Sequence, residues 1–440
     1  MKRLFTAALA IMVVCSSAPM AFADEISDLK REMASLRADY ESKIAMLMTQ
    51  VDSIARKSEA TSDRVSNLGS GITTEYVGRQ NGPFGKGGLI VREESGFGQV
   101  SVGGYMDHEF EDFDNTASTF DQHRWIINIG AELGDRLRFY SEYEIEHGGP
   151  DSASVGEAKV EQAWIDYLIV EQFNIRAGAV LVPFGRFNLY HDSDQQNLTQ
   201  RALVNRDIIP TTWTESGAGI YGEFELGGEA FEDWEFGYEA YVINGLNAGF
   251  SDTGMRGARG SLETDNNNNK ALVGRLVVSP ALGTEIGFSG YGGGYNTTGD
   301  DITGIAIDGL FTMGAWELTG EWAHFDVDEP AGSDVANDFD GYSVQLSYDF
   351  WCDALDDTFL GRSFDDPKFA IIGRFGAAEI SDDSDNGTGD NKEDRFTVGF
   401  NYRPVESWVF KLSYQWNDTD NETLEKGDSE GLTASVAMGF

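Results

Sequence analysis

The sequence has little cysteine, histidine and proline, and each shortage excludes something. Its 440 residues include 2 cysteines, 5 histidines and 9 prolines. We expect residues 1–23 to be cleaved off, which leaves Cys352 alone and excludes an internal disulfide. So few histidines and cysteines predict no metal cluster. No run of about 18 apolar residues follows Ala23, so a mature chain that enters a membrane must do so as a closed barrel.

Positive charge is also scarce. The chain has 32 Lys and Arg residues against 74 Asp and Glu residues, which argues against nucleic-acid binding. Hydrophobic residues make up 41%, so the acidity does not imply disorder. No Walker A motif occurs, and no G-x-S-x-G motif frames Ser193 beside His191. We therefore predict no enzymatic activity and no cofactor.

Residues 1–23 have the features of an export signal. Lys2 and Arg3 precede the apolar run Leu4–Val14, and Ala21-Phe22-Ala23 forms an A-x-A cleavage site. This pattern predicts a secretory signal peptide over residues 1–23, since the apolar run is too short for a membrane span.

Residues 24–68 show apolar positions at alternating steps of 3 and 4, from Ile26 and Leu29 to Val65 and Leu68. This a/d spacing predicts a coiled coil, with a single amphipathic helix packed on its own protein as the alternative. Residues 69–97 contain many glycines, and we interpret them as a Gly-rich linker.

From Gly98 onward the apolar residues alternate with polar ones. The last stretch is typical: Leu432, Ala434, Val436, Met438 and Phe440 share one face. Residues 98–440 read as sixteen such strands, with short and long connections in turn. A soluble β-sandwich shows the same alternation. Strands of about 9–11 residues with aromatics near their ends favour a transmembrane barrel.

The longest connection, residues 183–216, follows the fifth strand and begins Pro183-Phe184-Gly185. Sixteen strands, this loop and a final Phe resemble a general diffusion porin. The P-F-G junction and the N-terminal coiled coil are most similar to the phosphate-selective porin O/P family. The resemblance implies that the loop narrows the pore, that the chain forms a homotrimer, and that the assembly machinery of the outer membrane reads Phe440.

Charged residues of the loop are the candidates for a pore constriction. They are Arg186, His191, Asp192, Asp194, Arg201, Arg206 and Asp207. Facing them from the strands we expect Arg138, Glu142, Arg176 and Arg275 in the lumen. Opposed charges would set a transverse field across the gap, or else pair and pin the loop to the wall. Because both signs occur, we predict weak ion selectivity.

The sequence thus predicts an all-β protein, a 16-stranded antiparallel transmembrane barrel preceded by a coiled coil. We expect a porin of the bacterial outer membrane for small hydrophilic solutes or ions, in contact with lipid and lipopolysaccharide. The alternative is a structural barrel that its periplasmic coiled coil tethers to the cell wall, with peptidoglycan as a partner.

Overall fold

The computed structural model describes residues 43–44, 48–49, 51, 71–94, 96–148, 156–226, 234–328, 336–381, 391–420 and 429–440. The chain divides into two units, Met1–Gly71 and Ile72–Phe440. In the first unit the five residues described before Gly71 are helical. The predicted signal peptide and the rest of the predicted coiled coil lie outside the described residues. No helix among the described residues is long and apolar enough to cross a membrane.

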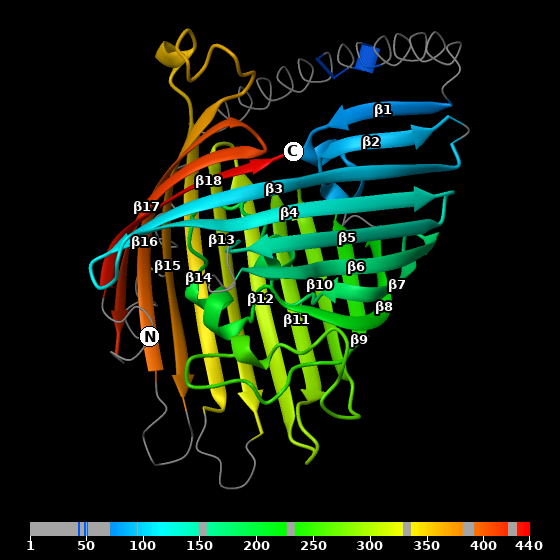
Figure 1. The fold of residues 1–440 in the computed structure, drawn as a ribbon, viewed down its shortest axis with the longest axis vertical. Helices are drawn as coiled ribbons and strands as arrows, with labels where there is room; N and C mark the ends of the chain where they lie inside the picture. The colour runs from blue at the N-terminus through cyan, green and yellow to red at the C-terminus, as the bar shows by residue number, and fades with distance from the viewer. Residues whose placement is uncertain are drawn as a thin grey trace, which may run out of the picture. The chain divides into compact units, whose positions relative to one another are not determined.

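The second unit is built from strands and a few short helical turns (Figure 1). The strands are Ile72–Val77 (β1), Gly88–Glu93 (β2), Gly98–Phe113 (β3), Thr119–Leu133 (β4), Leu137–Glu146 (β5), Glu157–Val170 (β6), Phe173–Leu181 (β7), Thr214–Glu225 (β8), Glu235–Ile243 (β9), Ala271–Ala281 (β10), Thr284–Gly294 (β11), Asp301–Met313 (β12), Trp316–Val327 (β13), Asp338–Phe350 (β14), Lys368–Ser381 (β15), Asn391–Val405 (β16), Trp408–Thr419 (β17) and Ser429–Gly439 (β18). The turns are Arg79–Asn81 (η1), Pro83–Gly85 (η2), Arg186–Leu189 (α3), Val204–Ile208 (η3), Arg256–Ala258 (η4) and Asp353–Leu355 (η5).

Strands β3 to β18 close into an antiparallel barrel of sixteen strands, as the sequence predicted. Each strand pairs with the next, and β18 returns to β3 in the register Gly431↔Phe113 to Gly439↔Tyr105. The connections between β4 and β5 and between β12 and β13 are tight turns at one end, which we call the turn end. The long connections lie at the other, the loop end (Figure 1). Trp351–Pro367 is a long connection at the turn end.

The two faces of the wall differ as the alternation predicted. On β4, Trp125 and Ile129 are exposed, whereas Ile126 and Asn128 between them are buried. The strands near the end of the chain repeat this arrangement, with Phe410 and Leu412 outside and Lys411 inside. An apolar outer band suits lipid, and a polar inner face suits a water-filled lumen.

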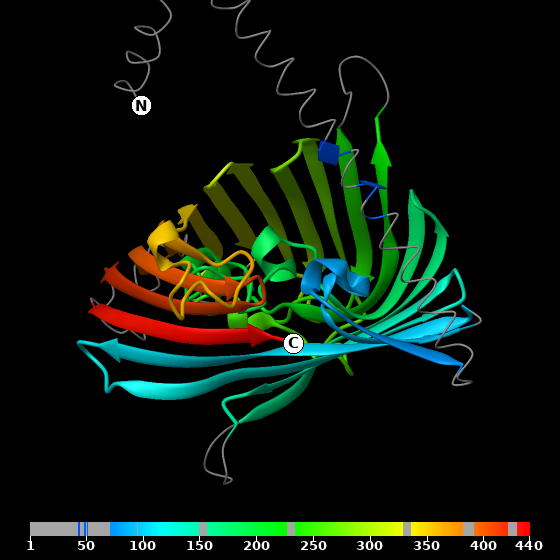
Figure 2. The same ribbon diagram turned by 90° about the horizontal axis from the view of Figure 1, so that it is seen from above.

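The expected Gly-rich linker contains ordered structure instead. Strands β1 and β2 pair as an antiparallel hairpin, and β2 extends the sheet along residues Gln99–Val102 of β3. The hairpin tip, Gly78–Gly87, enters the ring of strands at the turn end (Figure 2). The glycines suggested a linker, but the intervening Thr, Tyr, Val, Leu and Ile residues of β1 and β2 favour strands.

Part of the lumen holds an apolar core. Two connections at the loop end, residues 182–213 and 244–270, fold inward against the inner faces of β9 to β15. Buried apolar side chains of these connections meet apolar side chains of the wall, among them Phe325 and Phe339. The inner face is therefore polar near the turn end and partly apolar near the loop end, a difference that the alternation alone does not reveal.

Candidate functional site

The connection between β7 and β8, residues 182–213, crosses the lumen and forms the candidate constriction; we call it the inner loop (Figure 2). Gly185 allows the chain to turn inward, since its φ of 73° is costly for other residues. Its backbone N–H donates to Ser289 Oγ of β11 at 3.2 Å. The short helix α3 follows, and the π-helical turn η3 packs against β13, β14 and β15.

Apolar packing holds one side of the inner loop. Trp213 is fully buried, and its ring lies 5.9 Å from Phe184 and 5.2 Å from Tyr291, between ring centroids. Phe184 also packs on Phe325 of β13, with centroids 4.8 Å apart. Burying one such aromatic ring contributes roughly 1.5–3 kcal/mol. The inner loop therefore behaves as part of the fold's core on this side.

Cationic side chains of the opposite wall bind the backbone of the inner loop. Lys411 Nζ donates to Ser193 O at 2.7 Å, and Arg374 Nη2 donates to Gln200 O at 2.7 Å. Arg395 Nη1 donates to Arg201 O at 3.2 Å. Arg403 reaches the carbonyl groups of residues 194 to 196 at 2.7 to 3.3 Å. Carbonyl groups that are removed from water need donors, and charged donors give strong hydrogen bonds.

Two of the predicted acidic residues meet the N-terminal hairpin. Asp192 forms ion pairs with Arg79 and Lys86, and Asp194 forms one with Arg79. Lys86 Nζ also lies 3.7 Å from the buried Glu142 Oε1. Burial lowers the pKa of Lys86, and the carboxylate of Glu142 opposes that shift. The structure thus brings the predicted Asp192, Asp194 and Glu142 together with two cations that the sequence reading missed.

The other predicted loop charges are mostly paired as well. His191 Nε2 lies 2.7 Å from Glu161 Oε1 of β6. Arg186 Nη1 lies 2.5 Å from Glu285 Oε2 of β11. Arg206 binds Asp207 at 2.7 Å and Glu393 at 2.6 Å. Most of these loop charges are therefore neutralised in ion pairs that hold the inner loop in place.

Arg201 differs from the other loop charges. Its Nη1 donates to Thr211 O at 2.6 Å, and no carboxylate of the described residues forms an ion pair with it. Arg201 therefore keeps a positive charge that the hydrogen bond does not neutralise.

Each of the four strand residues expected in the lumen lies beside an opposite charge. Arg176 binds Asp166 of β6 at 2.7 and 2.9 Å and stacks on the Trp164 ring. Arg275 makes two hydrogen bonds to Asp308 of β12 and is buried. Arg138 pairs with Glu132 at 2.7 Å and stays half-exposed, and Glu142 is fully buried beside the hairpin.

Four cavities among the described residues have inner-loop residues in their lining, and three of these share lining residues with one another. One of about 250 Å³ and one of about 700 Å³ share Arg186 and Tyr190. The third, of about 20 Å³, shares Phe187 and Gln196 with the first and has room for about one water molecule. We call it the narrow cavity.

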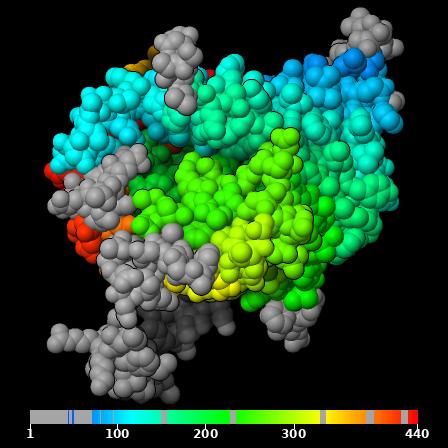
Figure 3. Space-filling view, turned by 60° about the horizontal axis from the view of Figure 1, so that its bottom comes forward, coloured from blue at the N-terminus to red at the C-terminus, as the bar shows by residue number. Residues whose placement is uncertain are grey.

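The described residues that line the narrow cavity include no carboxylate. They are His123, Arg124, Phe187, His191, Ser193, Gln196, Leu198, Thr199, Gln200, Arg201 and Lys411. Three basic side chains, Arg124, Arg201 and Lys411, therefore surround a space of about one water molecule. At the loop end, Figure 3 shows the green inner segments lying within the ring of strands.

Several residues of the site escaped the sequence analysis. Arg79 and Lys86 lie in the segment interpreted as a linker, and their aspartate partners follow more than 100 residues later. The alternation of the strands predicts that Arg403 and Lys411 point into the lumen. It does not predict that they bind carbonyl groups of the inner loop. His123 gave no signal, because alternation with the outward Trp125 predicts an outward side chain.

The family model for phosphate-selective porins O and P matches residues 99–307 and 290–440, nearly the whole barrel. A protein of Aquifex aeolicus (strain VF5), described as uncharacterized, is 39% identical over 155 residues. That match covers 34% of this chain and 33% of the relative, so the two correspond over about a third of their lengths.

Solved structures share the fold at low identity. OmpF of Salmonella typhi, in complex with daunomycin, has a TM-score of 0.53 and 11% identity over 78% of this chain and 98% of its own. A trimer form of OmpT of Vibrio cholerae has a TM-score of 0.50 and 12% identity, over 78% of this chain and 99% of its own. An anion-selective porin of Comamonas acidovorans has a TM-score of 0.50 and 12% identity, over 78% of this chain and 100% of its own. This chain belongs to the phosphate-selective porin O and P family, and it is an outer-membrane porin, a channel for the passive diffusion of ions or solutes.

Proposed function

We propose that this porin conducts small anions in preference to cations, and that the narrow cavity sets the preference. The observation that carries the proposal is the lining of that cavity, with Arg124, Arg201 and Lys411 and no carboxylate among its described residues. A pore selects by the charges at its narrowest point. This proposal replaces the weak selectivity that the mixed sequence composition suggested.

The magnitude follows from Coulomb's law. Two unit charges 4 Å apart interact with about 1 kcal/mol even in bulk water, and more where water is partly excluded. One kcal/mol corresponds to about a fivefold change in a permeability ratio. Arg124 is partly offset, because its guanidinium lies 3.2 Å from Glu144 and 3.4 Å from Glu146. Arg201 and Lys411 have no such carboxylate partner among the described residues, and they carry most of the effect.

For the orientation in the membrane, the coiled coil and the oligomeric state, we base our proposals on membership in the family. We infer that the turn end and the hairpin face the periplasm, where residues 24–68 form a coiled coil after cleavage at residue 23. The acidic loop end faces lipopolysaccharide. The trimer form of the OmpT neighbour supports a homotrimer, and Phe440 would serve as the assembly signal. Contact of the coiled coil with peptidoglycan remains the alternative role, which absent conductance would favour. The porin fold supports a channel without a catalytic step.

Planar-bilayer recordings test the ion preference. In a KCl gradient the zero-current potential of the wild type should report chloride as the more permeant ion. Arg201→Gln and Lys411→Gln should each lower the chloride preference about fivefold. Lys270→Gln is the matched control, since it removes one positive charge from an exposed loop position paired with Asp265. A potassium-selective wild type, or equal effects of all three variants, would contradict the proposal.

A further inference from the structure

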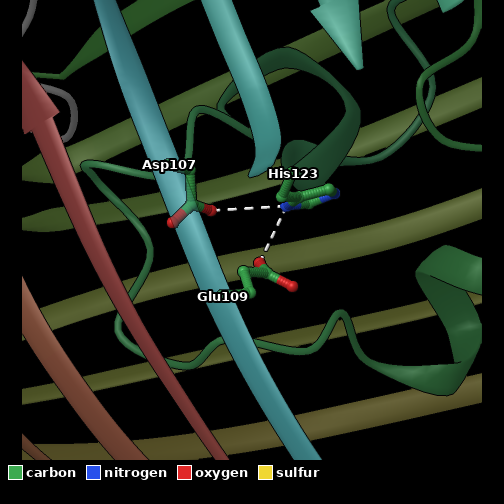
Figure 4. A group of neighbouring side chains, drawn as sticks. All are labelled: Asp107, Glu109 and His123. Carbon is green, nitrogen blue, oxygen red and sulfur yellow. Dashed lines mark hydrogen bonds and ion pairs between the residues drawn. The ribbon is translucent and has the colours of Figure 1, made fainter. Parts of the chain in front are cut away.

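Three side chains converge on the inner wall where β3 and β4 approach the loop end (Figure 4). His123 Nδ1 lies 2.8 Å from Glu109 Oε1 and 3.4 Å from Asp107 Oδ2. One ligand atom of each residue lies within 4.8 Å of the others. Both carboxylates are buried, and the imidazole is partly exposed. The cluster adjoins the inner loop, because His123 also lines the narrow cavity.

A local irregularity of the sheet brings His123 into this cluster. The register of β3 against β4 shifts between the pairs Asp107↔Arg124 and Glu109↔Asp121, so β4 uses one residue more than β3 there. Regular alternation from the inward Arg124 would turn His123 toward the lipid. The bulge turns its ring inward, toward the two carboxylates. Bulges of this kind commonly re-aim a side chain at a functional site.

The carboxylates of the cluster are incompletely satisfied. Asp107 Oδ1 is buried and meets no hydrogen-bond donor of the described residues, and the buried Glu109 Oε1 has only the imidazole nitrogen of His123 beside it. Asp107 is 1% exposed and Glu109 6%. The single Nδ1 faces both carboxylates, and one N–H can point along its axis at only one of them. A divalent cation placed among these atoms could contact all three residues at once.

The nearby basic residues do not fill this role. Arg124, the cross-strand neighbour of Asp107, directs its guanidinium at Glu144 and Glu146. Lys411 of β17 is paired with Ser435 of β18, and Ser435 is paired with Glu109 of β3, so Lys411 and Glu109 are two strands apart. The ammonium of Lys411 donates to Ser193 O. No lysine or arginine in the described part of the chain forms an ion pair with Asp107 or Glu109.

We propose that Asp107, Glu109 and His123 bind a divalent first-row transition metal ion at the inner wall of the channel. One imidazole nitrogen with two carboxylate oxygens is a donor set that Zn²⁺, Co²⁺ and related ions accept, with water completing the coordination. Mg²⁺ prefers oxygen ligands alone, so it is a weak competitor.

The cluster is partly open to solvent, because the His123 side chain is 22% exposed. The His147 ring lies 5.7 Å from the His123 ring, between centroids, and its side chain is 52% exposed. His147 Nδ1 is held by Asp121 Oδ2 at 2.7 Å, so His147 lines the approach and is not required as a ligand. An ion could therefore reach His123 without unfolding the wall.

Co²⁺ is the direct probe, because its visible absorption reports coordination by the protein. The detergent-solubilised full-length protein is titrated with Co²⁺ and, by calorimetry, with Zn²⁺ at neutral pH. We expect one ion per chain, with bands that Zn²⁺ displaces and Mg²⁺ does not. Asp107→Asn and Glu109→Gln should weaken binding by at least about tenfold, and His123→Gln should abolish the bands.

His324 provides the matched control. It lies 3.8 Å from Asp338 and 3.7 Å from Asp340, near the loop end of another strand pair, and all three side chains are at least 30% exposed. His324→Gln should leave the Co²⁺ bands unchanged. Equal loss in both histidine variants, or no bands in the wild type, would overturn the proposal.

A crystallographic measurement keeps the proposal testable if a variant does not assemble. Crystals of the wild type soaked in Zn²⁺ should show anomalous scattering between His123 Nδ1 and the two carboxylates. A zinc peak elsewhere with none at this position would contradict the site. Neither readout depends on ion conduction, so this inference and the proposed anion preference can fail separately.

Discussion

The guanidinium of Arg79 pairs with the carboxylate of Asp194, which follows 115 residues later in the chain. This contact links the N-terminal hairpin to the inner loop inside the lumen. Asp194 is almost fully buried, and an unpaired carboxylate would be costly there. The hairpin therefore supplies charges to the constriction as well as strands to the sheet.

The first prediction concerns the charges that the hairpin brings into the lumen. The double variant Arg79→Gln, Lys86→Gln removes two cations and leaves Asp192 and Asp194 uncompensated. The permeability ratio of chloride to potassium should fall, by about fivefold for each charge removed. The zero-current potential in a KCl gradient measures the change.

Two further variants control this experiment. Arg92→Gln lies in the same hairpin, but its partner Glu75, at 2.8 Å, is exposed, so the ratio should stay at the wild-type value. Adding Asp192→Asn and Asp194→Asn to the double variant should restore the ratio. An unchanged ratio in the double variant would show that the hairpin does not affect permeation.

The second prediction concerns alkaline pH. Burial lowers the pKa of Lys86, so its ammonium loses the proton below the ordinary lysine pKa of 10.5. As the pH rises through that lowered pKa, Lys86 becomes neutral and Asp192 loses one partner. The chloride preference should therefore decrease toward alkaline pH. The variant Lys86→Arg stays charged and should not show this decrease. An identical pH profile for both proteins would exclude Lys86 as the titrating group.

The third prediction concerns the wall cations that bind the inner loop. Arg403→Gln removes charged donors from three loop carbonyl groups, and each such hydrogen bond is worth roughly 1.5–3 kcal/mol. We expect larger and noisier single-channel currents, because the inner loop becomes mobile near Asp194. Arg136→Gln is the control, since Arg136 binds the carbonyl groups of Leu168 and Ile169 at the end of β6, outside the inner loop. If the currents of Arg403→Gln are as small and as free of noise as those of the wild type, Arg403 does not hold the inner loop in place.

The fourth prediction concerns the apolar side of the inner loop. Trp213→Ala should lower the free energy of unfolding by about 3–5 kcal/mol, because it leaves a cavity among Phe184, Tyr291 and Phe325. Urea-dependent loss of heat-modifiable gel mobility measures the stability. Trp213→Phe retains most of the ring volume and should lose clearly less. Equal stability of Trp213→Ala and the wild type would exclude a core role for the loop.

The sequence predicted the barrel well because its signal is local. Trp125 and Ile129 repeat every second residue along a strand, and lipid outside with water inside enforces that period. The number of strands, the closing pair of β18 with β3 and the length of the inner loop follow from such repeats. The family resemblance rested on the same local features.

The site could be predicted only in part, because its contacts join distant segments. The charges of residues 183–216 were recognised, but their partners depend on which wall residue faces each one in three dimensions. Arg79 and Lys86 were missed, since the glycines around them suggested a linker. His123 was missed because a single extra residue in β4 reverses the direction of its side chain.

The central claim is that anions occupy the narrow cavity among Arg124, Arg201 and Lys411. Crystals of the wild type soaked in rubidium bromide test it directly, since anomalous scattering locates each ion. The account predicts bromide within contact distance of Arg201 and Lys411 and no rubidium there. Rubidium in the narrow cavity, or bromide confined to the outer surface, would contradict it.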